Sequence, residues 1–402
     1  METYYELIQE KKYSKDKYIS DLRCVFETNV SRLKKKRKIK IAFQTAFVST
    51  WCGDEILLKF LNDERFDASI LITQQTNSNW EKERQLLVNH FKKMNVPYIV
   101  VNEDTYPGDY DIIVYTTPFI GSLEHFNSRD IPTKTLVCYI PYSFLLAKLQ
   151  GMQFNKFIHN ICWRNYITSK FYFKMADKYC DIGRMGMRFS GFPRMDGFIH
   201  NTVDEHDKGK KVIVYAPHHS INGAPYTSTF AENKDFFLKY AKKHQDETYW
   251  IVKPHPLLRV TSVEEGLFQS ELEYDEYLDQ WNRLPNAEVC ERDYMECFQE
   301  SDALILDSVS FLAEYMYVEK PILFLERDGI EFNELGNKIF NAVEKCSGTD
   351  FKKIDEFVLK SNYTELINKQ REVFDRYLNY WIDNSVLASE YIYRDIKNSL
   401  EG

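Results

Sequence analysis

One stretch of the sequence, residues 301–325, limits most strongly what the chain can fold into. Apolar runs near its two ends flank a helix-length segment, and three polar residues stand where that helix would begin, namely Asp307, Ser308 and Ser310. The pattern predicts a strand, a turn, a helix and a second strand. Parallel strands need such a helical crossover, and open α/β sheets bind ligands at the carboxyl ends of their strands. We therefore expect this turn to cap the helix, to bind a phosphate, or to do both.

The same alternation of apolar runs and helix-length segments occupies both halves of the chain. Strands are expected at residues 39–44, 68–73, 98–101, 111–115, 135–140, 212–215, 249–252, 287–290, 303–306 and 322–325. Helices are expected at residues 54–62, 79–94, 234–243, 271–283, 294–299 and 309–318. Such alternation predicts mainly parallel sheets covered by helices. The fold class is therefore α/β, with two facing Rossmann-like domains whose carboxyl edges would border a ligand cleft.

The predicted domain limits lie where the alternating pattern of strands and helices begins, is interrupted or ends. A charged helical lead-in occupies residues 1–38, and the first Rossmann-like domain occupies 39–195, with a helical, aromatic segment at 141–178. The boundary lies where Gly and Pro interrupt the pattern, and the second Rossmann-like domain then occupies 196–350. Residues 351–402 are predicted to be C-terminal helices that pack back on the domains.

Composition narrows the function classes. At 402 residues the chain suits two domains, and 52 basic against 60 acidic side chains, a net charge of −8, argue against a general nucleic-acid binder. No signal peptide and no apolar run of about 20 residues is present, so we expect a cytoplasmic protein. The basic run at 34–38 is a candidate for peripheral contact with the inner face of the membrane, or else a solvated lead-in to the first strand.

The eight cysteines never occur at Cys-x-x-Cys spacing, and several lie inside apolar runs. Cysteines of that kind are typical of reduced core residues in a cytosolic protein. We therefore expect no cysteine metal site. No metal or cofactor is expected beyond a nucleotide substrate, because cationic side chains and helix-end N–H groups can take the place of a metal at a phosphate.

Three turns of the second half follow predicted strands and carry polar groups. If the three strands are parallel neighbours, the turns lie on one edge of the sheet. Imidazole, ammonium, hydroxyl and helix N–H donors would then converge on one spot, as binding of a diphosphate requires. The residues of the turns are Pro217, His218 and His219 in the first, Lys253, His255 and Pro256 in the second, and Asp307, Ser308 and Ser310 in the third.

Each candidate has a plainer alternative. His255 stands between two prolines and has a restricted backbone, which suits a rigid donor to a leaving phosphate, although a loop histidine can simply cap a turn. Of His218 and His219, adjacent side chains that should point apart, at most one is expected to face the cleft. Lys253 could be merely solvated, and Glu314 could either bind ribose hydroxyls or face solvent. The chain has neither Gly-x-Gly-x-x-Gly nor a Walker sequence, which disfavours redox dinucleotide enzymes and P-loop NTPases.

Four short sequence motifs carry a resemblance to a known family. They are Tyr-Ala-Pro at 215–217, His-Pro at 255–256, the Ser-Asp, Asp-Ser-x-Ser and Lys-Pro series within 301–321, and Gly-Phe-Pro-Arg-Met-Asp at 191–196. In this combination the chain resembles the CDP-glycerol glycerophosphotransferase family, the teichoic-acid and capsule polymerases with a GT-B fold.

The resemblance implies a transferase that moves a glycerol-phosphate or related polyol-phosphate group from a CDP-activated donor to a cell-wall or capsular glycan and releases CMP. Residues 39–195 would bind the glycan or lipid-linked acceptor, and residues 196–350 would bind the cytidine nucleotide. The resemblance also implies that His255, Ser308 and Ser310 contact the phosphates of this nucleotide. Together with the polar turns, the predicted site comprises His255 and His219 as catalytic candidates, Ser308, Ser310, Lys253, His218 and Asp307 at the donor phosphates, and Glu314, Pro217 and Pro256 at the ribose and nucleotide.

The first domain departs from the family pattern. Family members carry a His-Gly pair that is thought to supply the general base, but the nearest segment here, residues 139–143, has no histidine. Asp54 or Glu55 at the start of the first helix could replace it as the base, although an Asp at that place more often caps the helix. The base is thus left open.

Three other functions remain open. His-Pro with a downstream serine pair is also used by bacterial sialyltransferases and Kdo transferases, so a GT-B glycosyltransferase with a CMP- or UDP-sugar donor is one alternative. A UDP-sugar 2-epimerase, an isomerase of the same two-domain shape, is another, but it needs several cleft carboxylates. A non-catalytic nucleotide-binding subunit is the third.

Overall fold

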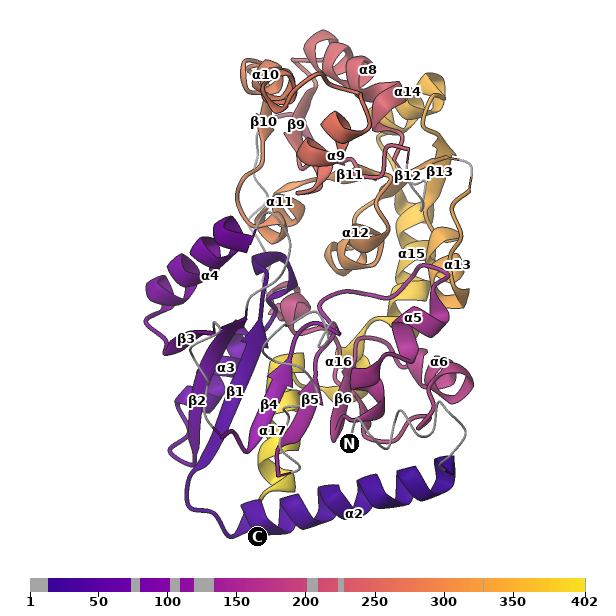
Figure 1. Cartoon of the computed structure of the whole chain (residues 1–402). Coiled ribbons are helices and arrows are strands. Elements are labelled where there is room, and N and C mark those ends of the chain that lie inside the picture. Colours follow the sequence, from indigo (N-terminus) through magenta and orange to yellow (C-terminus); the bar gives the residue numbers. More distant parts are fainter. Residues whose placement is uncertain are drawn as a thin grey trace. The chain divides into compact units, whose positions relative to one another are not determined.

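A computed structural model describes residues 14–73, 80–101, 109–118, 134–200, 209–222, 228–327 and 329–401 (Figure 1). The chain divides into two compact units. Unit 1 comprises Met1–Phe144, Leu149–Ile199 and Leu378–Gly402, and unit 2 comprises Leu145–Lys148 and His200–Tyr377. The division falls at Ile199, four residues after the predicted boundary.

Unit 1 contains a seven-stranded sheet of order β3-β2-β1-β4-β5-β6-β7, in which every pair of neighbours is parallel. Its strands are β1 (Ile39–Thr45), β2 (Phe66–Thr73), β3 (Tyr98–Val101), β4 (Ile112–Tyr115), β5 (Leu136–Tyr139), β6 (Arg164–Ile167) and β7 (Met187–Phe189). The five strands expected here are confirmed. The expectation that residues 141–178 are helical throughout is wrong at β6. This strand begins with the polar residues Arg164 and Asn165, so it lacks the continuous apolar run that predicts a buried strand.

The helices of unit 1 lie at both ends of the chain as well as between the strands. They are α2 (Lys15–Lys34), α3 (Asp54–Leu61), α4 (Trp80–Met94), α5 (Gln150–Phe154), α6 (Tyr172–Tyr179), α7 (Asp196–His200), α16 (Tyr380–Asn384) and α17 (Ala388–Ser399), with 3-10 turns η1 (Val48–Thr50), η4 (Phe157–Asn160) and η5 (Pro193–Met195). The amphipathic α2 buries one face of the predicted lead-in. Near its end, Lys36 of the basic run pairs with Asp111 at 2.5 Å.

The Gly-Phe-Pro-Arg-Met-Asp segment anchors the C-terminal helices. The buried Asp196 carboxylate accepts hydrogen bonds from the backbone N–H groups of Ala388 (2.8 Å) and Ser389 (2.9 Å) at the start of α17, and from the Tyr380 hydroxyl. Gly191 has φ +86°, and a Cβ there would collide with the Tyr380 ring. The motif therefore holds α16 and α17 within unit 1.

Unit 2 contains a six-stranded parallel sheet of order β10-β9-β8-β11-β12-β13. Its strands are β8 (Lys211–Ala216), β9 (Thr248–Val252), β10 (Ala287–Val289), β11 (Ala303–Leu306), β12 (Ile322–Glu326) and β13 (Glu344–Ser347). Its helices are α8 (Phe230–Lys243), α9 (Leu258–Glu264), α10 (Glu271–Asn282), α11 (Tyr294–Glu300), α12 (Val309–Glu314), α13 (Glu334–Phe340), α14 (Phe351–Leu359) and α15 (Thr364–Tyr377), with η6 (Tyr315–Val318). The predicted α/β class with two parallel sheets and a helical tail is confirmed.

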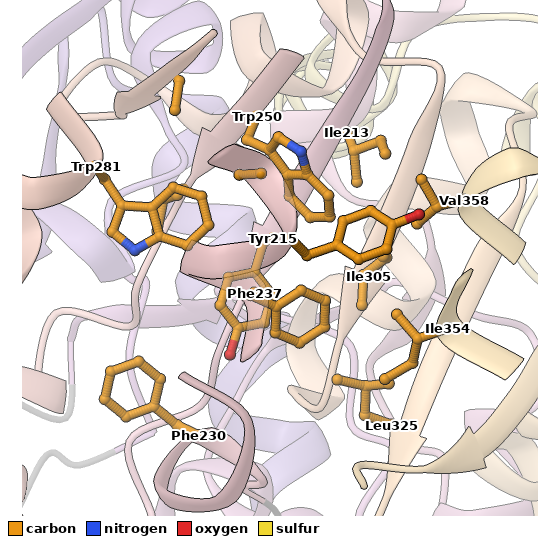
Figure 2. Close-up of a cluster of buried hydrophobic side chains, with 14 of the residues drawn as sticks. Ile213, Tyr215, Phe230, Phe237, Trp250, Trp281, Ile305, Leu325, Ile354 and Val358 are labelled. Carbon is orange, nitrogen blue, oxygen red and sulfur yellow. The ribbon is translucent and has the colours of Figure 1, made fainter. Parts of the chain in front are cut away.

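An aromatic core fixes the strands that lead to the polar turns of unit 2. Figure 2 shows Tyr215 of β8 beside Phe237, with ring centroids 4.2 Å apart, and Trp250 and Trp281 in the same buried cluster. The buried polar ends of these rings are satisfied, since the Tyr215 hydroxyl donates to Asn233 at 2.8 Å and the Trp250 indole donates to Thr248 at 2.9 Å. Full burial with satisfied polar atoms makes β8 and β9 rigid supports.

The C-terminal tail is shared between the units. Helices α14 and α15 belong to unit 2, where the buried Gln370 of α15 accepts from the Ile322 backbone N–H at 3.2 Å and donates to the Lys320 carbonyl at 2.8 Å. Helices α16 and α17 belong to unit 1. Within the described ranges, no helix is long and apolar enough to cross a bilayer.

Candidate functional site

The three polar turns of unit 2 lie at one edge of its sheet. Strands β9, β8 and β11 are consecutive and parallel, as expected. Backbone pairing continues past the strand ends, because Lys253 donates its N–H to the Tyr215 carbonyl (2.8 Å) and His255 donates to the Pro217 carbonyl (3.1 Å). The polar residues therefore project from a hydrogen-bonded frame.

Three imidazoles gather at this edge. The ring centroid of His219 lies 4.3 Å from that of His218 and 4.3 Å from that of His255, and the centroids of His218 and His255 are 5.2 Å apart. Both members of the His218-His219 pair thus join His255, although adjacent side chains were expected to point apart. The structure brings together residues 37 positions apart in sequence into one cluster.

Hydrogen bonds fix the tautomers of two of these rings. The backbone N–H of Ser220 donates to Nδ1 of His218 (3.2 Å), and that of Leu257 donates to Nδ1 of His255 (3.1 Å). A nitrogen that accepts an N–H carries no hydrogen itself, so in the neutral rings the hydrogen resides on Nε2. His218 and His255 are therefore presented as Nε2–H donors.

Burial keeps the cluster uncharged. It lowers the pKa of His218 to about 3 and that of His255 to about 3, with the neighbouring imidazoles as a further cause, and it also lowers the pKa of His219. Desolvation penalises a cation, and two nearby rings that could also protonate add repulsion. Near neutral pH the three rings are neutral hydrogen-bonding groups.

The same three histidines have the residue types of a transition-metal site, because one nitrogen from each lies within 4.8 Å of the others. A metal at Nε2 of His218 or His255 needs a lone pair on that atom, which would move the ring hydrogen to Nδ1. There it would face the N–H of Ser220 or Leu257. The observed hydrogen bonds thus favour donation to an anion over metal ligation.

Asp307, in the third polar turn, is hydrogen-bonded to the first polar turn at His218. Its carboxylate, 1% exposed, accepts from the His218 backbone N–H (2.6 Å), from the Thr229 backbone N–H and from the Thr229 hydroxyl (2.9 Å). Burial raises the pKa of Asp307 to about 6, so the carboxylate is still ionised near neutral pH. An ionised carboxylate cannot donate to a phosphate, and Asp307 is placed to position the His218 turn.

The remaining predicted site residues of unit 2 lie in α12, at its N-cap or in the first two polar turns. Ser308 is the N-cap of α12 and is buried, and its hydroxyl makes no capping hydrogen bond. Glu314, at the end of α12, is 4% exposed, so the solvent-facing alternative is wrong. Pro217 is buried and Pro256 is exposed. The side chain of Ser310 lies outside the described part of the structure.

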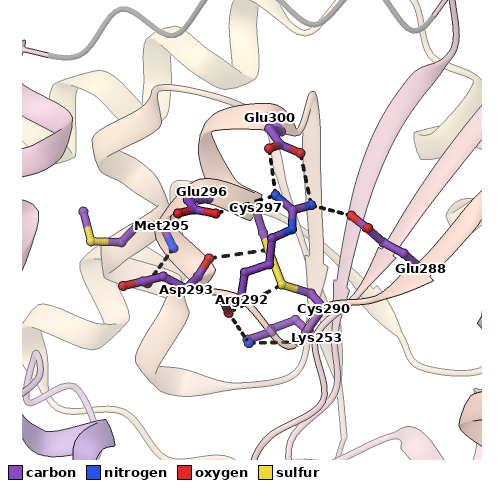
Figure 3. Close-up of a disulfide and its surroundings, with 9 residues drawn as sticks. All are labelled: Lys253, Glu288, Cys290, Arg292, Asp293, Met295, Glu296, Cys297 and Glu300. Carbon is purple, nitrogen blue, oxygen red and sulfur yellow. Dashed lines mark hydrogen bonds and ion pairs between the residues drawn. A yellow bond between two sulfur atoms is a disulfide. The ribbon is translucent and has the colours of Figure 1, made fainter. Parts of the chain in front are cut away.

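Lys253 points toward the polypeptide backbone. Its ammonium group donates to the carbonyl oxygens of Cys290 (3.0 Å) and Arg292 (2.8 Å), as Figure 3 shows. The same segment contains a disulfide between Cys290 and Cys297, so the expectation that all eight cysteines are reduced is wrong for these two. The predicted solvated alternative for Lys253 is likewise wrong, because its ammonium group fastens the loop after β10.

Replacing Lys253 by methionine is expected to lower the free energy of unfolding by about 1 to 3 kcal/mol, because two carbonyl acceptors lose a charged donor. Urea denaturation measures this loss. The affinity for a cytidine nucleotide should change little in the same variant. Unchanged stability together with much weaker nucleotide binding would instead support the predicted phosphate contact.

In unit 1, Asp54 is the first residue of α3, and Gly53 holds the N-cap position, so the capping alternative is wrong. The Asp54 carboxylate accepts from the Trp51 indole N–H (2.5 Å) and pairs with Nε2 of His90 (2.9 and 3.0 Å). Sequence analysis did not single out His90. It is a lone histidine inside an amphipathic helix, 36 residues from its partner, and no local pattern marks it.

A pocket of about 580 Å³ opens near the carboxyl ends of β12 and β13. The predicted site residues are absent from its described lining, so it is a separate concavity of unit 2. Its lining residues include Glu232, Glu326, Arg327, Phe332, Asn337 and Thr349.

Comparison with solved structures identifies the fold. The chain is similar to the wall teichoic acid polymerase TagF, in a variant soaked with CDPG (TM-score 0.59, 14% identity, 99% of this chain and 96% of that chain). It is also similar to a putative UDP-N-acetylglucosamine 2-epimerase from Listeria monocytogenes (TM-score 0.55, 12% identity, 90% and 96%). A third similar structure is the UDP-GlcNAc 2-epimerase from Neisseria meningitidis bound to UDP-GlcNAc (TM-score 0.53, 15% identity, 90% and 100%).

Sequence comparison identifies the family of the chain. No curated protein matches the chain in a sequence search. The family model for CDP-Glycerol:Poly(glycerophosphate) glycerophosphotransferase matches residues 153–398, more than half of the chain and all three polar turns of unit 2. The chain therefore belongs to the CDP-glycerol:poly(glycerophosphate) glycerophosphotransferase family.

Proposed function

We propose that this protein transfers glycerol phosphate from CDP-glycerol to a hydroxyl group of a cell-wall or capsular glycan and releases CMP. The observation that carries the proposal is the cluster of His218, His219 and His255, in a chain that belongs to a glycerophosphotransferase family. Neutral imidazole donors on a rigid sheet edge suit a diphosphate, whose charge moves between oxygens during transfer.

The reaction has one bond-forming and one bond-breaking event at phosphorus. The acceptor oxygen bonds to the β-phosphorus, the bond from that phosphorus to the bridging oxygen breaks, and the electron pair leaves with CMP. Negative charge grows on the leaving phosphate. An Nε2–H of His255, whose Nδ1 is held by the Leu257 N–H, is the donor that we assign to this charge.

The remaining donor-site assignments concern residues at the same edge of the unit 2 sheet. We assign His218 and Ser308 to the donor phosphates and Asp307 to holding the His218 turn. Glu314 and the two turn prolines, Pro217 and Pro256, are assigned to the nucleotide. No metal or organic cofactor is needed, because the neutral donors supply the stabilisation that a cation would otherwise provide. We further propose that the protein works in the cytoplasm, with the basic run contacting the inner membrane face.

Donor titration tests the choice among the alternatives. Isothermal titration with CDP-glycerol, a CMP-sugar and a UDP-sugar should show the tightest binding for CDP-glycerol. Tight UDP-sugar binding without any response to cytidine nucleotides would reject the proposal in favour of a glycosyltransferase or an epimerase. The carboxylates that an epimerase needs are scarce at these turns, where Asp307 is already occupied by three donors.

The affinity for CDP-glycerol should be nearly independent of pH between about pH 6.5 and 8, because His218 and His255 are already neutral there. The diphosphate diester of the donor does not titrate in this range, and Asp307 stays mostly ionised above its pKa of about 6. If an imidazolium of ordinary pKa were required, the affinity would fall about tenfold as the pH rises through this range. Calorimetric Kd values across the range distinguish the two outcomes.

A further inference from the structure

A disulfide bond in unit 2 joins the loop that follows β10 to the helix α11. Cys290 comes directly after β10 and Cys297 lies in the middle of α11, at a sequence separation of 7 (Figure 3). Both side chains are buried, with Cys290 5% exposed and Cys297 fully enclosed. The other six cysteines are free. The bond therefore closes one short loop, residues 291–293, against the helix that follows it.

The loop is also fastened to the second polar turn, in which Lys253 and His255 lie. The ammonium group of Lys253 donates to the carbonyl oxygens of Cys290 (3.0 Å) and Arg292 (2.8 Å). Lys253 precedes His255 by two residues, and the residue between them is a proline. Because proline restricts the backbone, a movement of Lys253 is passed on to His255. The position of the loop therefore bears on the position of His255.

Two other side chains of the loop make interactions at the surface. The Arg292 guanidinium, on a side chain that is 33% exposed, pairs with Glu300 at 2.7 Å and also with Glu288. Asp293 is the N-cap of α11 and accepts the Met295 N–H at 3.0 Å. Ion pairs that are accessible to water are weak, whereas a covalent bond restrains its two ends in any solvent. The disulfide is therefore the strongest of these restraints on the two carbonyl groups that the second polar turn binds.

The proposed cytoplasmic location gives such a bond a particular meaning. Thiols in the cytoplasm are kept reduced by dithiol proteins and glutathione, and the disulfides that do occur there are mostly catalytic or redox-sensing. The bond here is buried, but the loop that it closes is short and has Glu291 and Asp293 exposed to solvent. Opening of this loop alone would give a reductant access to the sulfur atoms, without unfolding of the sheet.

We propose that Cys290 and Cys297 form a redox-active pair whose oxidation state sets how firmly the second polar turn is held. A thiolate of a dithiol reductant bonds to one sulfur of the pair, and the S–S bond breaks. The second thiolate of the reductant then bonds to the first and releases the remaining cysteine. The reductant ends as a disulfide and the two cysteines end as thiols, so two electrons and two protons have moved.

The catalytic consequence of this switch rests on the proposed function, which assigns His255 to the leaving phosphate. Once the bond is reduced, the two carbonyl acceptors of Lys253 are held less firmly, and the turn opens more often. The consequence for the turn itself concerns unit 2 alone and holds whatever the protein binds.

The test compares the oxidised protein with the protein reduced by dithiothreitol, a small dithiol. Free thiols are counted by alkylation and mass spectrometry, and hydrogen exchange of backbone amides is followed in the native state. The amides of Lys253, His255 and Leu257 report on the turn, because each donates a hydrogen bond and prolines separate them. The matched variants are Cys297→Ala, which lacks the bond, and Cys24→Ser, which removes an exposed free thiol of α2. The kcat for CMP release and the affinity for CDP-glycerol are measured in parallel.

The oxidised protein should be alkylated at six cysteines and the reduced protein at eight. After reduction we expect the three amides of the turn to exchange about tenfold faster, because local opening becomes easier. The kcat should fall by about tenfold with little change in donor affinity, since His255 is then aligned less well with the leaving phosphate. Cys297→Ala should behave like the reduced wild type with or without dithiothreitol, and Cys24→Ser should respond as the wild type does.

Lys253→Met isolates the connection between the loop and the turn. Its two cysteines should still be reduced by dithiothreitol, but its kcat and the exchange of its turn amides should not respond, because the ammonium group that joins the two segments is gone.

Three results would overturn the inference. Eight alkylated cysteines in protein purified under air without reductant would show that the bond does not form. A bond that resists dithiothreitol until urea unfolds the protein would show a purely structural disulfide. Equal exchange of the turn amides in the oxidised and reduced wild type would show that the bond and the turn are not coupled, and this comparison holds even if Cys297→Ala fails to fold. A protein that binds no cytidine nucleotide and releases no CMP would instead remove the proposed function alone, because thiol counting and amide exchange still decide whether the pair is redox-active.

Discussion

Replacing His255 by alanine is expected to lower kcat for glycerol-phosphate transfer by about 10²- to 10³-fold, because the reaction loses a rigid donor at the leaving phosphate. The effect should appear mainly in kcat, since charge on the leaving oxygen grows only toward the transition state. The ring accepts one backbone N–H, that of Leu257, so its loss should leave the fold intact. Steady-state CMP release, with circular dichroism as the check on folding, measures the effect.

The control for His255 is His244→Ala, which removes a histidine of the same unit from the end of α8. This variant should keep the wild-type rate. A His255→Ala protein with near-normal turnover would reject the assignment of His255. A fall in kcat of similar size in both variants would also reject it, because the loss would then come from a general perturbation of unit 2.

Replacing Asp307 by alanine is expected to lower the free energy of unfolding of unit 2 by about 3 kcal/mol or more. The substitution leaves three donors unpaired, namely the His218 N–H and the N–H and hydroxyl of Thr229. The Thr229 groups are buried and cannot turn to water without movement of the chain. The His218 turn should loosen as a result, and transfer activity should fall with it. Urea denaturation combined with hydrogen exchange of β8 and β11 measures the loss.

Asp302 provides the matched control for Asp307. It lies just before β11, is exposed, and accepts a single hydrogen bond, from the Val212 N–H at 2.7 Å. Asp302→Ala should lower the free energy of unfolding by only about 1 kcal/mol, because a single donor loses its acceptor. If the two alanine variants were equally stable, the proposed role of Asp307 as the connection between the turns would be contradicted.

The parallel strands of both sheets could be predicted wherever they were apolar along their length. The strand β11 is an example, because all four of its residues are apolar, and β1 is another, because four of its seven residues are apolar and they include Ile39, Ile41 and Phe43. Burial on both faces of a parallel sheet favours such runs. The strands β7 and β13 escaped prediction, since they have three and four residues and β13 contains Glu344 and Lys345. Sheet-edge strands of this kind are defined by their neighbours and not by a local pattern.

The location of the candidate site could be predicted from the sequence, but the roles of its residues could be predicted only in part. Polar residues at the ends of three adjacent strands indicated the sheet edge, and the cluster of His218, His219 and His255 lies there. The hydrogen bonds that decide what each group can do were not readable from the sequence. Lys253 donates to two carbonyls and Asp307 accepts from three donors, and both sets of partners lie far away in the chain.

The same limit explains why His90 was missed. Asp54 could be selected as a carboxylate at the start of the first helix, but its partner comes from a helix that carries no sequence motif. A pair formed across 36 residues depends on how α4 packs against the loop after β1. Only tertiary contacts such as that between Trp51 and Phe91 determine that packing.

The division of the C-terminal tail also depends on contacts between distant segments. Helices α14 to α17 follow one another in sequence as a continuous helical pattern, which predicted a single tail. Gln370 binds the start of β12 in unit 2, whereas Asp196 binds the start of α17 in unit 1. Partners of this kind assign each helix to its unit.

The central claim, that a glycerol-phosphate group moves from a CDP donor to a glycan hydroxyl, is tested most directly by identifying the products. The purified protein is incubated with CDP-glycerol and a hydroxyl-terminated glycan or glycerol-phosphate primer, and the products are followed by mass spectrometry and phosphorus NMR. The account predicts one CMP released for each glycerol-phosphate unit added through a new phosphodiester. Release of CDP, epimerisation of a UDP-sugar without an acceptor, or an unmodified primer beside intact CDP-glycerol would contradict it.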